Sequence, residues 1–202
     1  VEIKGILMST YKAYDHFKLN TDSDEILWLC IDRKDAKVNS LSYEVFEELD
    51  AIIDEVQPNR PKGVIIFSGK KNGFVAGADI TQFTKLENEE QGFKIIRQAQ
   101  LILDKLEALP MPTVAMINGF ALGGGCELAL ACRYRIAEDG PKTIIGLPEV
   151  KLGIHPGWAG TVRLPKLIGA LKAMSIILPG RALKAKQAAR IGMIDAAVPL
   201  RQ

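Results

Sequence analysis

Short continuous apolar runs alternate along this chain with stretches whose apolar residues recur every three or four positions. Continuous runs of this length are typical of buried strands, and they occupy residues 17–19, 25–32, 64–68, 113–117, 134–137 and 143–146. The three- and four-residue spacing is typical of amphipathic helices, and it occupies residues 41–56, 88–109, 159–168, 170–178 and 184–191. Because strands and helices alternate, the pattern predicts an α/β protein, whose N-terminal part repeats loosely as strand, strand, helix.

The sequence also marks the ends of the two longest predicted helices. The first is expected to open at Asn39 or Ser40 and to end at Pro58, because proline cannot donate the next helical hydrogen bond. The second is expected to end before Pro110. Its apolar face is predicted to consist of Phe93, Ile96, Leu101, Leu103 and Leu106.

Three consecutive glycines, Gly123, Gly124 and Gly125, follow the strand predicted at 113–117 and precede Cys126 and Glu127. Glycine loses more backbone freedom on folding than any other residue, so packing alone does not explain such a run. It suits a backbone that approaches a ligand closely or leaves its amides free. The helix expected to begin at Cys126 would direct its free N–H groups and its dipole toward an anion or a polarised oxygen.

A second glycine-hinged segment, Ala76-Gly77-Ala78, also follows an apolar strand. Two amide donors that converge on one oxygen form an oxyanion hole, in which the loss of one donor typically costs about 3–4 kcal/mol. Two glutamates, Glu127 and Glu149, lie among apolar neighbours, and burial there would raise the pKa of each carboxyl toward neutrality. Their spacing alone leaves ordinary surface glutamates as an open alternative.

Composition excludes some classes of protein. Hydrophobic residues make up 48% and charged residues 25% of the chain, as in ordinary soluble proteins. The length suffices for one domain, which we place at 1–202. The net charge of +2 and the lack of a basic tract weigh against a nucleic-acid partner. The uncharged stretch 108–126 contains Pro110, Pro112 and several glycines, so we expect no membrane span.

Familiar cofactor, metal and nucleophile motifs do not occur. The glycine run fits neither GxGxxG nor GxxxxGK[ST], and no GxSxG elbow is present. The three cysteines are an odd number without CxxC spacing, so we expect reduced thiols and a cytoplasmic protein. The only histidines are His16 and His155, which form no metal-ligand cluster, and His155 is expected to be a loop histidine. We therefore expect no metal and no bound cofactor.

Four segments carry a resemblance to a known family: FVAGADI at 74–80, INGFALGGGCELALAC at 117–132, GLPEVKLGIHPG at 146–157 and GRALKAKQAARIGMIDAAVP at 180–199. In their order and spacing the chain resembles the enoyl-CoA hydratase/isomerase, or crotonase, superfamily. It is most similar to the N-terminal hydratase part of bacterial multifunctional fatty-acid oxidation proteins. The resemblance implies a right-handed spiral of strand-strand-helix units, assembled as a trimer or within a larger complex.

The resemblance also implies roles for particular residues. The backbone amides of Ala78 and Gly124 would hold the thioester oxygen of an acyl-CoA. Glu127 would take a proton from water, and Glu149 would help to hold that water and supply the α-proton. Members with both glutamates favour hydration, and multifunctional members also shift a double bond from Δ3 to Δ2. Further substrate contacts are expected at Val75, Ala76, Asp79, Ile80, Gly123, Pro148, Gly157 and Trp158.

Two departures from the family pattern affect these expectations. Trp158 and Ala159 stand where the family often has small residues or glycine, in a loop that borders the acyl pocket of relatives. The chain also stops before the family's last helices and before the dehydrogenase region of the multifunctional proteins, so we expect an open fragment. The alternatives are a non-catalytic module that binds RNA or a protein partner, and an isomerase. Lys70 or Lys71 would meet a CoA phosphate, unless they belong to a solvated loop.

Overall fold

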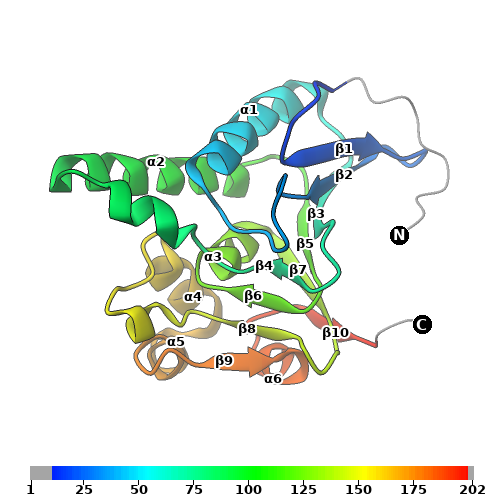
Figure 1. The fold of residues 1–202 in the computed structure, drawn as a ribbon. Helices are drawn as coiled ribbons and strands as arrows, with labels where there is room; N and C mark the ends of the chain where they lie inside the picture. The colour runs from blue at the N-terminus through cyan, green and yellow to red at the C-terminus, as the bar shows by residue number, and fades with distance from the viewer. Residues whose placement is uncertain (1–10, 200–202) are drawn as a thin grey trace.

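The larger of two sheets forms the centre of the computed structural model, which describes residues 11–199 (Figure 1). Its order is β1-β2-β3-β5-β7-β10, and every neighbouring pair is parallel except the first. The strands are β1 (Phe17–Thr21), β2 (Ile26–Ile31), β3 (Gly63–Ser68), β5 (Thr113–Ile117), β7 (Tyr134–Glu138) and β10 (Ala196–Val198). The strands predicted from continuous apolar runs are therefore confirmed here. The predicted 1–202 domain extends beyond the described residues at 1–10 and 200–202.

A smaller sheet with the order β4-β6-β8-β9 lies beside the first one in Figure 1. Its strands are β4 (Gly73–Val75), β6 (Phe120–Leu122), β8 (Ile144–Gly146) and β9 (Ala182–Lys184). The first three are parallel, and β9 is antiparallel to β8. Sequence reasoning found β8 and missed β4, β6 and β9, because most three-residue strands are too short to show a period.

The helices complete a repeated unit of strand, strand and helix. They are α1 (Tyr43–Asn59), α2 (Glu89–Glu107), α3 (Gly124–Ala131), α4 (Gly160–Ile168), α5 (Ala170–Ile177) and α6 (Ala185–Arg190), with 3₁₀ turns η1 (Ile80–Lys85) and η2 (Glu149–Leu152). The units β3-β4-α2, β5-β6-α3 and β7-β8-α4 each place one strand in the larger sheet and the next in the smaller one. The unit before these, formed by β2 and α1, has no strand in the smaller sheet. Leu41 forms only an isolated parallel bridge with Ala78 at that place. The predicted crotonase spiral is thus confirmed.

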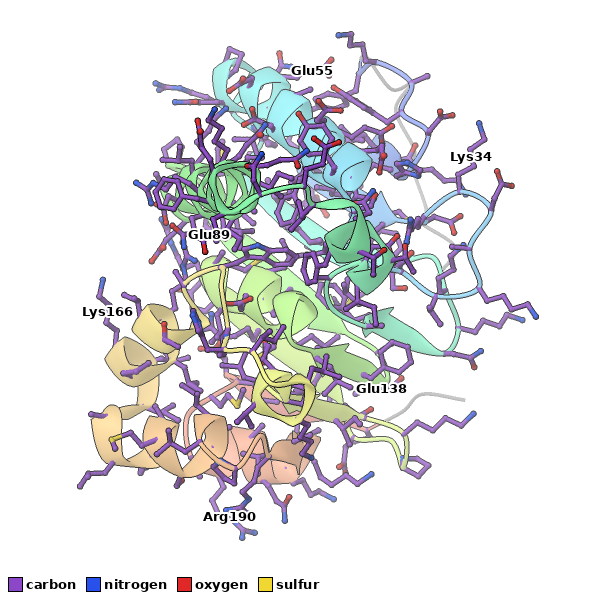
Figure 2. The ribbon with its side chains drawn as sticks, turned by 60° about the vertical axis from the view of Figure 1, so that its left-hand side comes forward. Lys34, Glu55, Glu89, Glu138, Lys166 and Arg190 are labelled. Carbon is purple, nitrogen blue, oxygen red and sulfur yellow. The ribbon has the colours of Figure 1, made fainter. Side chains whose placement is uncertain are left out.

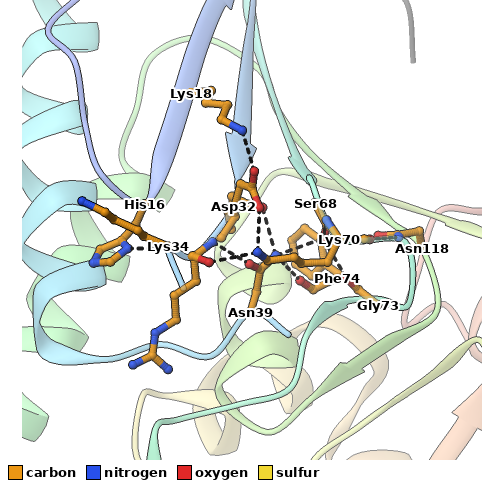
Figure 3. A network of polar contacts seen from close by, with 12 residues as sticks. His16, Lys18, Asp32, Lys34, Asn39, Ser68, Lys70, Gly73, Phe74 and Asn118 are labelled. Atoms are coloured by element: carbon orange, nitrogen blue, oxygen red, sulfur yellow. Dashed lines mark hydrogen bonds and ion pairs between the residues drawn. The ribbon is translucent and has the colours of Figure 1, made fainter. Parts of the chain in front are cut away.

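Helix α1 begins later than predicted, because the side chain of Asn39 hydrogen-bonds to neighbouring strands and does not cap the helix. Asn39 is fully buried, and its Nδ2 donates to Ile31 O, Ser68 Oγ and Phe74 O at the ends of three strands (Figure 3). These bonds hold the chain extended before the helix, and Ser42 caps it by accepting from the Val45 N–H.

The predicted end of α1 is also displaced. Pro58 lies inside the last turn, and Arg60, in the left-handed conformation with φ 44°, ends the helix.

The predicted apolar face of α2 is only half right. Leu103 and Leu106 are buried, but Phe93 and Leu101 are 70% and 48% exposed, and Ile96 is also exposed. The N-terminal half of α2 reaches beyond the neighbouring elements at the left of Figure 1, so only the second half packs along the core. The spacing predicted the helix correctly but could not show where the body of the protein ends.

Charged side chains lie around the periphery of the molecule in the view of Figure 2. Figure 2 shows Lys34, Glu89, Lys166 and Arg190 at separate places on the periphery. Within residues 11–199 no helix is long and apolar enough to cross a membrane. The same residues hold no group of three or more His, Cys, Asp or Glu side chains arranged for a metal ion.

Two glycines inside helices should respond oppositely to alanine. A Cβ on Gly125 would overlap the Val75 carbonyl oxygen, so we expect Gly125→Ala to lower the free energy of unfolding by about 2 kcal/mol or more. A Cβ on Gly92 would meet only Leu86 Cδ1, at 3.6 Å, so Gly92→Ala should stabilise α2 by about 0.5–1 kcal/mol. Urea unfolding of both variants tests this, and equal effects would contradict the packing described.

Candidate active site

The two glycine-hinged segments meet at the carboxyl ends of β4 and β6. These strands are parallel neighbours, so Ala76–Ala78 and Gly123–Gly125 leave the same edge of the smaller sheet. A Cβ placed on Gly77 would lie 3.2 Å from Leu122 O and 3.8 Å from Gly124 N. Gly77 and Gly123 have φ values of 116° and 53°, which a residue with a Cβ rarely adopts. The backbone here is therefore shaped by glycine for close approach.

The amides of Ala78 and Gly124 are left free by this arrangement. Leu41 pairs with the first segment, since its N–H donates to Gly77 O at 2.8 Å and its carbonyl accepts from Asp79 N at 3.0 Å. The Ala78 N–H has no acceptor among the described residues. The Gly124 N–H, in the first turn of α3, has none there either. The site thus presents two N–H donors at adjacent backbone segments.

Glu127 lies in the first turn of α3 and is 1% exposed. Its Oε1 accepts hydrogen bonds from the N–H groups of Trp158, at 2.8 Å, and Gly160, at 2.7 Å. Burial raises the pKa of this carboxyl to about 7, and nearby Glu149 adds to the rise, while the two N–H donors and Arg163 oppose it. At neutral pH this group can therefore exist in either protonation state, as a general base or acid requires.

Glu149 opens η2, directly after Pro148, and is 8% exposed. Its Oε2 is buried and has no hydrogen-bond partner among the described residues. Burial raises the pKa of this carboxyl, while a hydrogen bond from its own backbone N–H and the charge of His155 oppose the rise. A Cβ on Gly123 would lie 3.2 Å from Glu149 Oε1, so this carboxyl lies against the glycine segment. A buried oxygen without a partner is suited to a substrate or a water.

A cavity of about 580 Å³ collects most of the predicted residues. Its walls include Ala76, Ala78, Ile80, Gly123, Gly124, Glu127, Pro148, Glu149, Gly157 and Trp158. Val75 and Asp79 do not line it: Val75 is fully buried beneath Gly125, and Asp79 forms an ion pair with Arg33 at 2.6 Å.

Sequence reasoning missed several other wall residues, among them Phe83, Leu86, Ile95 and Gln100. His155 is a loop histidine, as predicted, and it also lines the cavity. Helix α2 carries two of the missed residues, and no local motif marks them. Their place in the wall depends on how the whole helix packs.

Trp158 packs directly behind the amide of Gly124. Its ring is buried, meets Phe46 edge to face at 4.8 Å, and occupies the space that a Cβ on Gly124 would need. The bulky residue at this position therefore requires a glycine opposite it. Ala159 adopts φ 71°, a left-handed conformation that costs a non-glycine residue about 1 kcal/mol. This strain accounts for the glycine that the family often has there.

Lys70 belongs to neither of the two roles considered for it. Its Nζ lies 2.8 Å from Asp32 Oδ1 and donates to Arg33 O at 2.9 Å, within the network around Asn39 (Figure 3). The Lys70 side chain is 18% exposed, so it is not part of a solvated loop. Its ammonium holds the strand ends together, and Lys71 remains the exposed lysine of the pair.

The cavity thus brings together two buried carboxyls and two free amides on a spiral of parallel strands. Comparison with known proteins shows the family of the chain. Residues 22–202 match the enoyl-CoA hydratase/isomerase family, and the chain belongs to that family. It is 43% identical over 185 residues to the fatty acid oxidation complex subunit alpha of Aliivibrio fischeri, covering 91% of this chain and 27% of that relative. The chain thus spans about a quarter of the relative's length.

Solved structures with the same fold include two hydratases. The enoyl-CoA hydratase of Bacillus anthracis is 35% identical, with a TM-score of 0.84 over 91% of this chain and 70% of that one. A second enoyl-CoA hydratase, from Geobacillus kaustophilus, is 31% identical, with a TM-score of 0.87 over 93% and 70%. Pseudomonas aeruginosa DspI is 26% identical, with a TM-score of 0.85 over 96% and 72%.

The raised pKa of Glu127 makes a prediction about stability. Between its ordinary pKa of 4.5 and about 7, the folded protein binds more protons at this group than the unfolded chain, so stability falls as pH rises. Glu127→Gln removes this dependence. The free energy of unfolding of the variant, relative to the parent, should therefore rise by about 2–3 kcal/mol between pH 4.5 and pH 8.

Urea unfolding at both pH values measures this difference, with Glu89→Gln on the surface of α2 as the matched control. A difference for Glu127→Gln that does not change with pH would show that this carboxyl titrates normally.

Proposed function

We propose that the chain is an enoyl-CoA hydratase that adds water across the double bond of 2-enoyl-CoA thioesters. The observation that carries the proposal is the convergence of two free backbone amides and two buried carboxyls on one cavity. Membership of the family and the two hydratase structures support it. No cofactor is part of the proposal, because water and the acyl-CoA are the only reactants.

The amides act on the charge that forms during the reaction. Attack of water at C3 of a conjugated thioester moves electrons onto the carbonyl oxygen and produces an enolate. The N–H groups of Ala78 and Gly124 would donate to that oxygen, and the dipole of α3 would add to their effect. Because the donors are already in place, little reorganisation is needed when the charge forms.

The two glutamates divide the proton transfers. Glu127 is held through Oε1 by two N–H donors, which favour its ionised form, so it is suited to take a proton from the attacking water. Glu149 has no such donors on its buried Oε2, which favours its protonated form, so it is suited to deliver the α-proton. Acid–base help of this kind contributes about 10²–10⁴-fold to a rate. The same enolate would also support a Δ3 to Δ2 shift as a second activity.

The cellular setting belongs to the same proposal. The name of the Aliivibrio fischeri relative supports a role in fatty-acid β-oxidation, within an oligomer or a larger oxidation complex in the cytoplasm. The alternative of a non-catalytic module predicts binding without turnover. A gel shift with RNA at physiological salt tests the nucleic-acid form of that alternative, which the scattered charges of Figure 2 disfavour.

Crotonyl-CoA hydration tests the proposal, followed by the loss of absorbance of the conjugated thioester. We expect turnover with a rate that falls below about pH 7 as Glu127 is protonated. Glu127→Gln and Glu149→Gln should each lower kcat by about 10²-fold or more, while Glu89→Gln should match the parent. Turnover that neither substitution reduces would refute the mechanism.

A further inference from the structure

The loop from Gly157 to Gly160 donates hydrogen bonds to Glu127 through its N–H groups and accepts hydrogen bonds from α2 and α4 through its carbonyl groups. Its Trp158 and Gly160 N–H groups point to Glu127 Oε1, while its carbonyl groups accept from other elements. Gly157 O accepts from Gln100 Nε2 of α2 at 2.7 Å, and Trp158 O accepts from Arg163 Nη1 of α4 at 3.0 Å. Each donor to Glu127 therefore depends on a loop that Gln100 and Arg163 hold in place.

Gln100 acts on the same peptide group that serves Glu127. The carbonyl of Gly157 and the N–H of Trp158 belong to one planar peptide bond, so a donor on the carbonyl fixes the direction of the N–H. It also polarises that N–H, because hydrogen bonds in a chain strengthen one another. Two hydrogen bonds thus connect the Gln100 amide, through the Gly157–Trp158 peptide group, to the Glu127 carboxylate.

Arg163 joins the loop to the buried half of α2. Its guanidinium is 6% exposed and donates to Glu107 Oε2 at 2.8 Å, to Asp104 Oδ1 at 2.6 Å and to Trp158 O. All three of its nitrogens are occupied, in a planar geometry that lysine cannot reproduce. The loop is therefore fixed against α2 at two points one helical turn apart.

We propose that Gln100 and Arg163 are positioning residues that orient the peptide donors of Glu127 and so set the protonation of the catalytic base. The proposal rests on the proposed hydratase function, and neither residue needs to touch the reacting atoms. The charged groups that face Glu127 are Glu149 from η2 and Arg163 from α4, with His155 on the wall of the same cavity. Loss of a donor disfavours the ionised carboxyl, so the pKa of Glu127 should rise when the loop is released.

Gln100→Leu is the first test, because it removes the donor without removing a charge. The acidic limb of kcat/KM for crotonyl-CoA should move up by about half to one pH unit, and kcat should fall by about tenfold. KM should stay within about threefold of the parent. Gln98→Leu, two residues away on α2 and without a hydrogen bond to the loop, is the matched control and should leave the acidic limb and kcat unchanged. Gln100→Lys keeps an N–H donor and should restore most of kcat.

Arg163→Lys is the second test, paired with Arg135→Lys. Both arginines are buried and ion-paired, but Arg135 contacts Asp195 and the carbonyls that follow α3, not the loop. Both substitutions should lower stability, and only Arg163→Lys should move the acidic limb. Equal pH profiles for the two folded variants would overturn the assignment of Arg163.

A readout independent of turnover separates this inference from the proposed function. In protein labelled with ¹³C at glutamate carboxyls, the Glu127 signal is identified by its loss in Glu127→Gln and titrated by NMR. Its pKa should rise in Gln100→Leu and Arg163→Lys and stay constant in the two controls, even if crotonyl-CoA is not hydrated. An unchanged Glu127 titration in Gln100→Leu, or a rise in KM with kcat unchanged, would overturn the proposal.

Discussion

The close approach of two backbone segments at Gly77 and Gly123 is the constraint on which the rest of the site depends. Gly77 and Gly123 bend the chain through φ values that a side chain would resist, and Gly124 lies against the ring of Trp158. Only this packing brings the Ala78 and Gly124 amides to the same cavity. In the smaller sheet, β4 and β6 are parallel neighbours, and this pairing places the two segments side by side.

The environments of Glu127 and Glu149 differ in their hydrogen-bond donors, although both carboxyls are buried. Burial raises the pKa of both carboxyls, but Glu127 accepts from two peptide N–H groups of a separate loop, whereas Glu149 is opposed by its own backbone N–H. The loop that provides these donors is itself held by α2 and α4. The acid–base chemistry therefore depends on elements that are far apart in sequence and that never touch the reacting atoms.

Much of this arrangement is visible in the sequence. The glycine run, the second glycine hinge and the glutamates among apolar residues were all predicted, and the structure brings them to one cavity. The apolar runs predict the first five strands of the larger sheet because each of them is long enough to show its pattern. The short strands β4, β6 and β9, the exposed end of α2 around Phe93 and the contact of Gln100 were not predictable, because each depends on tertiary packing and leaves no local period.

The structure of the Glu127→Gln protein with a bound 2-enoyl-CoA tests the central claim most directly, because the substrate is then held before water attacks. The account predicts that the thioester oxygen lies about 2.7–3.1 Å from both the Ala78 and the Gly124 nitrogen. The α-carbon should lie beside Glu149 within the same cavity. A thioester oxygen bound away from either amide would contradict the account.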